Sequence, residues 1–597
     1  MIKVSDYVAK FFFDKGVRHV FMVTGGGAMH LNDSLVRFCP YHVVFNHHEQ
    51  ACAIGAEGLY RASGHIGIVN VTTGPGGLNS LTGLMGQWTD SIPAIYISGQ
   101  VKYETTLMSC RDLSLRQLGD QEVDIIPIVK PLTKYSVSVV DPLTIRRCLE
   151  EAWYWATQGR PGPVWVDVPM NVQGAIVDES TLEGFVPPGT ETNTIPWDLI
   201  LKKLESFQRP VVVAGHGIRL SGTRNYLINL LSKWNVPVVT TFNGFDLLPD
   251  EHPSFCGRIG TIGTRGGNFT LQNADGVLVL GSRNNIRQSS YNWENFAHRA
   301  YKIVVDVDSA ELEKPTVRPD LPIHADLREF LPELVNLWSS HSNSGNSEWL
   351  SWAKARTAKY PGARPEQFLE KERINPYAFM HRLTTSIPPS DLVVAGNGTA
   401  CVALFQAGVV RNEQRFFWNS GCASMGYDLP AAIGAAVGCS STIWCLAGDG
   451  SLQMNLQELA TVAFNRLPIK LVYLNNGGYA SIRQTQANFF ASQYGCGIES
   501  GLGFPDIEKL ASAYGIPYVK SSNIDQVVDD ANRVLTISGP VIWEVDLKLD
   551  YSFEPKLSSE KLPDGRMQSK PLEDMYPFLE REEFYSNMFH KNQKENL

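Results

Sequence analysis

The chain lacks the paired cysteines that redox motifs and structural metal sites use. Its ten cysteines stand singly, with no Cys-x-x-Cys, which predicts reduced thiols and no zinc cluster. No stretch approaches the roughly 20 apolar residues that a membrane span needs. The first residues show no signal-peptide pattern. These absences predict a cytoplasmic protein with no membrane anchor.

A basic surface is also missing. Asp and Glu outnumber Lys and Arg by 61 to 52, for a net charge of −9, which argues against general nucleic-acid binding. The composition, with 43% hydrophobic and 19% charged residues, is typical of a globular protein. At 597 residues the chain is long enough for roughly three or four domains.

Apolar runs alternate with helical periods in three successive blocks, which predicts α/β domains with parallel sheets. The blocks, in chain order, are residues 1–175, 195–338 and 373–550. Polar linkers at 187–192 and 339–345 separate them. The tail, residues 551–597, is polar and poorly periodic, and the sequence leaves open whether it covers a site or is a loose end.

Individual elements can be predicted inside each block. Helices are expected at 4–15 and 452–465. The expected strands, from first block to last, are 19–23, 67–71, 94–97, 163–169, 210–214, 236–240, 276–280, 303–307, 443–447 and 471–474.

Two short polar sequences of the third block each follow a predicted strand: Gly448-Asp449-Gly450 and Asn475-Asn476. Asp449 and Asn476 offer hard oxygen atoms, which suit Mg²⁺. The glycines beside Asp449 let backbone approach a phosphate closely. Because the carboxyl ends of parallel strands meet at one edge, the sequence predicts a site for a diphosphate with Mg²⁺ at this edge.

This stretch resembles the thiamine diphosphate signature, which begins with Gly-Asp-Gly and ends with Asn-Asn. The resemblance covers nearly the whole chain, because three α/β blocks with the signature in the last are the layout of thiamine diphosphate-dependent decarboxylases and carboligases. Within that family the chain is similar to the acetolactate (acetohydroxyacid) synthase-like branch, and there to members that act on nucleotide-linked keto-sugars. The resemblance implies three consecutive doubly wound parallel-sheet domains: pyrimidine-binding, central and diphosphate-binding.

The resemblance also implies three catalytic residues. Glu49, in His48-Glu49-Gln50, resembles the carboxylate that hydrogen-bonds the cofactor's pyrimidine and relays protons. Taken alone, Glu49 is better explained as a helix-start carboxylate stabilised by the helix dipole, and it is the Mg²⁺ motif elsewhere in the chain that favours the catalytic role. Gln100 resembles a Gln that lies over the thiazolium ring, and Met425 resembles the apolar side chain that holds the cofactor bent.

The cofactor and metal contacts follow from the same resemblance. It places Mg²⁺ on Asp449, Asn476 and the backbone carbonyl of Gly478, where the synthases proper carry a Glu. It places the rest of the cofactor against residues with small, hydroxyl-bearing or aromatic side chains: Glu49, Gly398, Thr399, Met425, Gly448, Gly450, Ser451 and Tyr479.

Two departures from the synthases concern the substrate. Asp120 stands where they carry a Phe that lines the pyruvate pocket, and Thr485 where they carry a Trp that selects the acceptor. Losing two aromatic side chains makes room and adds polarity, which favours a polyhydroxylated acceptor over a small keto acid. Gln121 resembles a contact to the donor substrate.

The sequence of the second block does not decide whether a flavin binds there. Synthases bind a non-redox FAD there, and residues 280–283 and 306–308 resemble segments of that site. The His of their flavin loop is replaced around residues 260–263, and no Gly-x-Gly-x-x-Gly follows a strand. FAD is one interpretation; the other is that Arg283 anchors a carboxylate or diphosphate of the acceptor.

The resemblance implies a homodimer or homotetramer, because Glu49 and the Mg²⁺ motif of one active site come from different subunits. The implied function is decarboxylation of a 2-oxo acid, with pyruvate expected, and transfer of the two-carbon unit to a carbonyl acceptor. Alternatives are an acetolactate synthase large subunit, a simple decarboxylase, or a non-catalytic structural or regulatory family member. The intact Glu49, Asp449 and Asn476 argue against the last of these.

Overall fold

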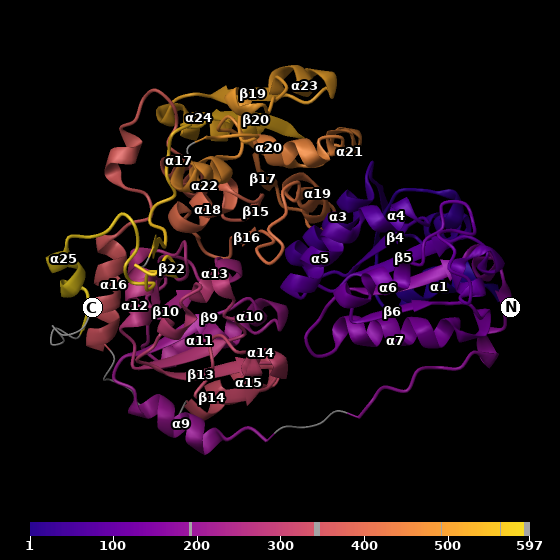
Figure 1. Ribbon diagram of the computed structural model, residues 1–597, viewed down its shortest axis with the longest axis horizontal. Coiled ribbons are helices and arrows are strands. Elements are labelled where there is room, and N and C mark those ends of the chain that lie inside the picture. The colour runs from indigo at the N-terminus through magenta and orange to yellow at the C-terminus, as the bar shows by residue number, and fades with distance from the viewer. Residues whose placement is uncertain (190–193, 339–346, 491, 562, 590–597) are drawn as a thin grey trace.

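Three six-stranded parallel sheets organise the chain in a computed structural model, which describes residues 1–189, 194–338, 347–490, 492–561 and 563–589 (Figure 1). Helices cover the faces of each sheet, so the prediction of three consecutive doubly wound parallel-sheet domains is confirmed. The first domain contacts the third, and in Figure 1 the central domain lies below the third and to the left of the first.

The first sheet has the strand order β3-β2-β4-β5-β7-β6. Its strands are β2 (His19–Met22), β3 (His42–Phe45), β4 (Gly67–Val71), β5 (Ile95–Gln100), β6 (Tyr135–Ser138) and β7 (Val164–Pro169). Its helices are α1 (Val4–Asp14), α2 (Met29–Arg37), α3 (Glu49–Ser63), α4 (Pro75–Asn79), α5 (Leu81–Asp90), α6 (Ile125–Val129), α7 (Ile145–Thr157) and α8 (Met170–Gln173). An antiparallel pair, β1 (Ile2–Lys3) with β8 (Ile176–Val177), joins the two ends of this domain.

The central sheet has the order β11-β10-β9-β12-β13-β14. Its strands are β9 (Pro210–Ala214), β10 (Val238–Thr240), β11 (Phe255–Arg258), β12 (Gly276–Leu280), β13 (Tyr301–Asp306) and β14 (Leu321–His324). Its helices are α9 (Trp197–Ser206), α10 (Gly217–Leu220), α11 (Arg224–Lys233), α12 (Arg265–Gln272), α13 (Ile286–Ser289), α14 (Ser309–Glu313), α15 (Leu327–Trp338) and α16 (Ser347–Lys359). β9 and β12 are apolar throughout because helices bury both of their faces.

The third sheet has the order β16-β15-β17-β18-β20-β19. Its strands are β15 (Leu392–Ala395), β16 (Arg415–Phe417), β17 (Ile443–Gly448), β18 (Ile469–Asn475), β19 (Tyr518–Ser521) and β20 (Val541–Asp546). Its helices are α17 (Pro376–Ser386), α18 (Thr399–Ala407), α19 (Asp428–Gly438), α20 (Asp449–Leu452), α21 (Glu458–Phe464), α22 (Ala480–Phe489), α23 (Ile507–Ala513) and α24 (Val527–Thr536).

Helices α3 and α19 hold the first and third domains together. They approach so closely that a β-carbon added to Gly58 would lie 2.1 Å from the carbonyl oxygen of Ala431, and one added to Gly434 would lie 1.9 Å from that of Gly55. One hydrophobic cluster continues through this contact and contains buried residues of both domains. The close approach fixes the start of α3 relative to the third domain.

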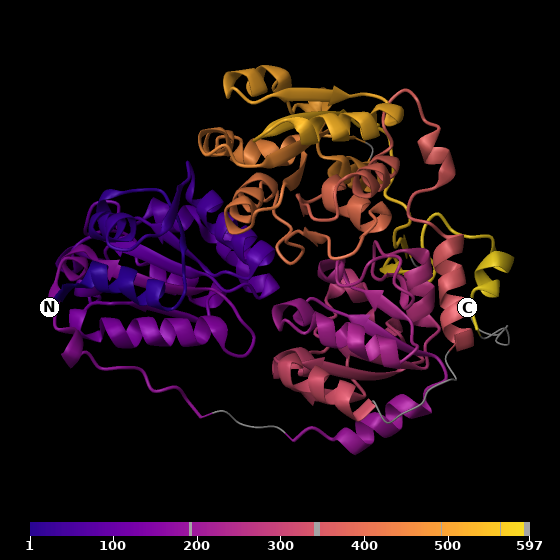
Figure 2. The ribbon, with the colours of Figure 1, turned by 180° about the vertical axis from the view of Figure 1, so that it is seen from behind.

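The C-terminal segment packs on the central domain. It contains β21 (Ser559–Lys561), β22 (Met567–Ser569) and α25 (Arg581–Ser586), drawn in yellow near α16 (Figures 1 and 2). The backbone N–H of Leu557 donates to the carbonyl of Thr261 at 2.7 Å. Asn268 Nδ2 donates to the carbonyl of Leu572 at 3.0 Å. Over its described residues the segment is therefore not a loose end.

Every predicted strand is present in the structure, but several bounds differ and one predicted helix is replaced. β4, β9 and β12 have the predicted bounds, and the other predicted strands shift by a few residues at their ends. The single helix predicted at 452–465 is wrong: α20, a 3₁₀ turn at Gln453–Asn455 and α21 replace it. The side chain of Asn455 bonds the carbonyl of Gly426 at 2.7 Å at this break. Residues 190–192 and 339–345 of the predicted linkers lie outside the described residues.

Across the described ranges, no helix combines the length and apolar character that crossing a bilayer requires.

Replacing Gly434 with Ala tests the α3–α19 contact. Ala favours a helix over Gly by about 1 kcal/mol, but its β-carbon would overlap the backbone of α3. We expect Gly434→Ala to lower the free energy of unfolding by about 1–3 kcal/mol, measured by thermal denaturation. Gly503→Ala, where no heavy atom lies within 4 Å of the added carbon, is the control. Equal stability of both variants would contradict the contact.

Candidate functional site

Three loops of the third domain meet at the carboxyl edge of its sheet. They follow β15, β17 and β18, which are neighbours in the sheet. The loop after β15 contains Gly398, the loop after β17 contains Asp449, and the loop after β18 contains Asn476. Parallel strands that end side by side bring together residues that are distant in sequence.

Asp449 is held by backbone donors on both sides of its carboxylate. Oδ1 accepts from the N–H of Gly450 at 2.7 Å, and Oδ2 accepts from the N–H of Gly478 at 2.8 Å. Burial raises the pKa of Asp449 to about 6, and the two N–H groups oppose this effect. The carboxylate joins the loops after β17 and β18 and has lone pairs left for a cation.

The carboxamide of Asn476 is hydrogen-bonded through its nitrogen, whereas its oxygen has no partner in the described part of the chain. Nδ2 donates to Thr399 Oγ1 at 3.0 Å and to the hydroxyl of Tyr551 at 3.1 Å. Oδ1 is buried and has no hydrogen-bond partner among the residues that the structure describes. A buried carbonyl-type oxygen on the loop neighbouring that of Asp449 fits a hard cation such as Mg²⁺.

Gly478 and Gly450 are required by close contacts. Gly478 has φ +120°, and a β-carbon there would lie 2.2 Å from the carbonyl oxygen of Cys496. A β-carbon on Gly450 would lie 2.0 Å from the ring of Tyr479. The Gly478 carbonyl, the predicted third metal ligand, accepts the N–H of Ala480 at 3.0 Å and keeps its second lone pair.

The loop after β15 also fits an approaching phosphate. Gly398 has φ +83° and precedes α18, whose first residue is Thr399. Around Gly448, no heavy atom lies within 4 Å of an added β-carbon. These positions leave open backbone around Asp449 and Asn476, as a diphosphate group needs.

Met425 lies half-buried in a turn that is fixed to this edge. Asn397 Nδ2 donates to the carbonyl of Ser424 at 2.7 Å, and the N–H of Gly426 donates to Ser451 Oγ at 2.8 Å. Ser451 Oγ itself donates to Asp428 at 2.5 Å. The Ser451 hydroxyl is therefore used inside the protein, and a phosphate contact from this residue falls to its backbone N–H.

Glu49 lies in the first domain, at the start of α3, and is 8% exposed. His48 caps the helix, because its Nδ1 accepts the N–H of Gln50 at 3.1 Å. Glu49 Oε2 accepts from Asn79 Nδ2 at 3.0 Å, and a β-carbon on Gly76 would lie 3.4 Å from Oε1. The glycine leaves space beside the carboxylate.

The loop after β4 brings the other predicted residues of this domain together. Gln100, 1% exposed, accepts the hydroxyl of Thr73 on Oε1 and donates from Nε2 to the carbonyl of Val123 at 2.9 Å. A β-carbon on Gly74 would lie 1.9 Å from the carbonyl oxygen of Gln121. Glu49, Gln100 and Gln121 thus lie at one edge of the first sheet.

The two positions that depart from the synthases are both exposed. Asp120 lies in an irregular segment after β5, next to Gln121. Thr485 lies on α22, and its hydroxyl donates to the carbonyl of Ser481 at 3.0 Å. Neither side chain is part of the core.

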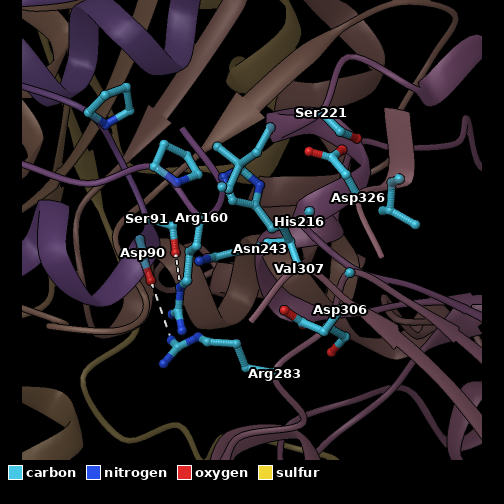
Figure 3. A pocket seen from close by; sticks show the side chains of 18 of the residues that line it. Asp90, Ser91, Arg160, His216, Ser221, Asn243, Arg283, Asp306, Val307 and Asp326 are labelled. Carbon is cyan, nitrogen blue, oxygen red and sulfur yellow. Dashed lines mark hydrogen bonds and ion pairs between the residues drawn. The ribbon is translucent and has the colours of Figure 1, made fainter. Parts of the chain in front are cut away.

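Arg283 lines a cavity of about 300 Å³ in which residues of all three domains take part (Figure 3). Its guanidinium lies 3.8 Å from Asp90 Oδ1, and Arg160 beside it donates to Ser91 Oγ at 2.8 Å. The cavity wall holds buried polar atoms without a hydrogen-bond partner in the described chain: both ring nitrogens of His216 and the Oδ1 atoms of Asn243, Asn284 and Asn285. Burial lowers the pKa of His216 well below its usual value, so its ring is neutral.

Sequence reasoning missed several residues that support the site. Tyr551 contacts Thr399 and Asn476 from a tail with no periodic pattern, so no local signal marked it. Asn79 fixes Glu49 from 30 positions away. Asp428, three positions after Met425, is fully buried, and an acidic residue at the start of an apolar helix was the available signal.

Three family models match successive parts of the chain. They are described as the N-terminal TPP binding domain, the central domain and the C-terminal TPP binding domain of thiamine pyrophosphate (thiamine diphosphate) enzymes, over residues 2–128, 198–334 and 396–545. The acetolactate synthase large subunit of Lactococcus lactis is 31% identical over 549 residues, 91% of this chain and 92% of that protein. The isozyme 3 large subunit of Escherichia coli is 30% identical over 86% of this chain and 89% of that protein.

Asp167 lies in β7, the strand next to β5, and its burial predicts that the stability of the protein depends on pH. Its carboxyl is 1% exposed and accepts the hydroxyls of Ser98 and Ser138 at 2.6 and 3.1 Å. Burial raises the pKa of Asp167 to about 7 from 3.8, so the folded state keeps a proton that the unfolded chain loses. Between about pH 4 and 7 this group should therefore lower the free energy of unfolding by up to about 1.4 kcal/mol per pH unit.

Asp167→Asn cannot ionise, so its unfolding free energy should gain on that of the wild type as pH rises from 5 to 7. Thermal denaturation of both proteins across this range measures the difference. Stability curves that run parallel would contradict a raised pKa for Asp167.

Proposed function

This chain belongs to the thiamine diphosphate-dependent enzymes, in their acetolactate synthase-like branch, and we propose that it decarboxylates pyruvate and joins the two-carbon unit to a carbonyl acceptor. The acceptor that we propose is a nucleotide-linked keto-sugar. The observation that carries the proposal is the edge formed after β15, β17 and β18, where Asp449, the unpartnered Asn476 Oδ1 and open glycine backbone converge.

We propose that Mg²⁺ binds Asp449, Asn476 Oδ1 and the Gly478 carbonyl, with the cofactor's diphosphate against Gly398, Thr399 and the backbone of residues 448–451. The carboxylate and the amide oxygen form the hard donor set that Mg²⁺ prefers. When bound, thiamine diphosphate supplies the nucleophilic carbon and the electron-accepting ring for decarboxylation. Met425, fixed through Ser424 and Gly426, would support the cofactor's bent shape.

Glu49 would hold and relay a proton at the cofactor's pyrimidine nitrogen. Its carboxylate is buried, oriented by Asn79, and faces the space left by Gly76. A carboxylate whose position is fixed can take up a proton and return it at the same place throughout a catalytic cycle.

We propose that each site lies between two subunits, in a homodimer or a homotetramer. Within the described chain, no hydrogen bond joins Glu49 to Asp449, Asn476 or Met425. Apolar side chains near Glu49 are left half-exposed, among them Phe45 and Leu78, as expected for a surface that another subunit covers.

The central cavity is proposed to hold a nucleotide, FAD being the first to test. A neutral His216 and the free oxygens of Asn243, Asn284 and Asn285 require polar partners, and Arg283 and Arg160 suit a diphosphate. Its size fits part of such a ligand. Purified protein that shows no flavin absorbance after soaking in FAD would contradict the flavin.

The choice of acceptor rests on Asp120 and Thr485. Both are polar and exposed at an edge where a second subunit would close the site. A large hydroxylated acceptor needs polar partners and room. The second candidate is acetolactate formation from pyruvate alone. It is favoured by the two relatives named acetolactate synthase, which match 91% and 86% of this chain.

The experiment is CO₂ release from pyruvate with thiamine diphosphate and Mg²⁺, with and without nucleotide-linked 4-keto-6-deoxy sugars. Mass spectrometry reads the products. A sugar that gains two carbons and stimulates CO₂ release supports the keto-sugar acceptor. Acetolactate at the same rate from pyruvate alone would establish the second candidate in its place.

Glu49→Gln keeps the size and hydrogen bonding of the side chain but cannot relay a proton. We expect turnover to fall about 10²- to 10⁴-fold, while thermal stability and Mg²⁺-dependent cofactor binding stay as in the wild type. The control is Glu183→Gln, an exposed carboxylate in the same domain, which should keep full turnover. Near-wild-type turnover in Glu49→Gln would defeat the assignment.

A further inference from the structure

Tyr551 takes part in a closed triangle of hydrogen bonds at the proposed metal site. The amide nitrogen of Asn476 lies 3.0 Å from Thr399 Oγ1 and 3.1 Å from the Tyr551 hydroxyl and donates to this pair of oxygens. The two hydroxyls also bond each other. Because the two hydroxyls contact each other, they lie on the same side of the amide nitrogen and share one of its N–H groups.

This triangle decides which way the Asn476 carboxamide points. An amide has a donor end and an acceptor end, and only the acceptor end can bind a cation. Because the two hydroxyls face the nitrogen, Oδ1 is directed away from them and stays buried without a partner in the described structure. Thr399 and Tyr551 together hold the nitrogen end of the amide on their side.

The triangle also leaves one hydroxyl hydrogen unused. Thr399 and Tyr551 carry one hydroxyl hydrogen each, and their mutual bond uses one of them. Among the described residues, no other acceptor for the second hydrogen is present. A hydroxyl hydrogen at a buried site needs an acceptor, and a phosphate oxygen is a strong one.

The backbone around Tyr551 is fixed by side chains of helices α22 and α17. Gln484 of α22 donates from Nε2 to the carbonyl of Tyr551 at 3.0 Å and accepts the N–H of Phe553 at 3.3 Å. The N–H of Glu554 donates to the hydroxyl of Tyr377 at 2.8 Å. The ring of Tyr551 is therefore positioned by a stretch of backbone that is itself hydrogen-bonded to the third domain.

We propose that Tyr551 is a positioning residue of the cofactor site: its hydroxyl orients Asn476 Oδ1 toward Mg²⁺ and gives a hydrogen bond to the cofactor's diphosphate. This inference rests on the proposed function, because it assumes that this edge binds Mg²⁺ and a diphosphate. It assigns the start of the C-terminal segment, outside the family-model match that ends at residue 545, to cofactor binding.

Tyr551→Phe removes the hydroxyl and keeps the ring. Groups that orient a metal ligand typically change metal affinity 10- to 100-fold, so we expect the dissociation constant of Mg²⁺, at fixed thiamine diphosphate, to rise at least about 10-fold. Calorimetric titration of the full-length protein measures it without reference to turnover. The control is Tyr41→Phe, which removes another tyrosine hydroxyl, bonded to the carbonyl of Ala9 at 2.6 Å, and should bind as the wild type does.

Hydrogen exchange of the wild-type protein gives a second test that needs no variant. Adding Mg²⁺ and thiamine diphosphate should slow exchange at the N–H groups of Phe553 and Glu554 as well as at Gly478. Slower exchange at Gly478 with no change at Phe553 and Glu554 would overturn the role of Tyr551.

The two proposals fail in different ways. Wild-type protein that binds neither Mg²⁺ nor thiamine diphosphate overturns the proposed function and this inference with it. Normal wild-type binding, with Tyr551→Phe binding equally well or more tightly, overturns this inference alone.

Discussion

The candidate site depends on one constraint: β15, β17 and β18 are adjacent parallel strands, so their following loops emerge at one edge. That geometry brings Asp449 within 2.8 Å of the Gly478 N–H, 29 positions along the chain, and Asn476 within 3.0 Å of Thr399, 77 positions away. Loops in these tight conformations need glycine where backbone meets backbone. Asp449 and the unpartnered Asn476 Oδ1 then offer oxygen ligands at one edge of the described structure, which is what a metal-bound diphosphate requires.

The contact between α3 and α19 fixes where Glu49, at the start of α3, lies relative to the third domain. Its glycines place the two helix backbones so close that the first domain has a defined position against the third. Asn46 and the N–H of His47, just before α3, add bonds between the same two domains, both to Glu458 of α21 at 2.9 Å. Glu49 nevertheless bonds within its own domain, beside half-exposed apolar side chains. In the proposed oligomer, a second subunit would cover this surface and bring its metal motif to Glu49.

How much the sequence could predict follows from the range of each interaction. Strands such as β9 and β12, and the pair Asp449 and Asn476, lie in local patterns that a single sequence displays. The helix predicted at 452–465 failed because Asn455 bonds Gly426 and breaks the turn, a contact 29 positions away. The place of Ser451 after Gly450 predicts a phosphate contact, which stays a prediction; its hydroxyl bond to Asp428, 23 positions away, is a contact that a single sequence does not display. Tyr551 had no local pattern at all, because its partners come from two loops far away in the chain.

Subunit complementation tests the account most directly. Glu49→Gln and Asp449→Ala should each abolish turnover, and the two variants are then unfolded together, refolded and assayed. If each site takes Glu49 from one subunit and Asp449 from the other, a mixed dimer has one intact site of two. Random pairing then restores about a quarter of wild-type activity. Mixed dimers that form, as shown by differently tagged subunits, but stay inactive would contradict a site shared between subunits.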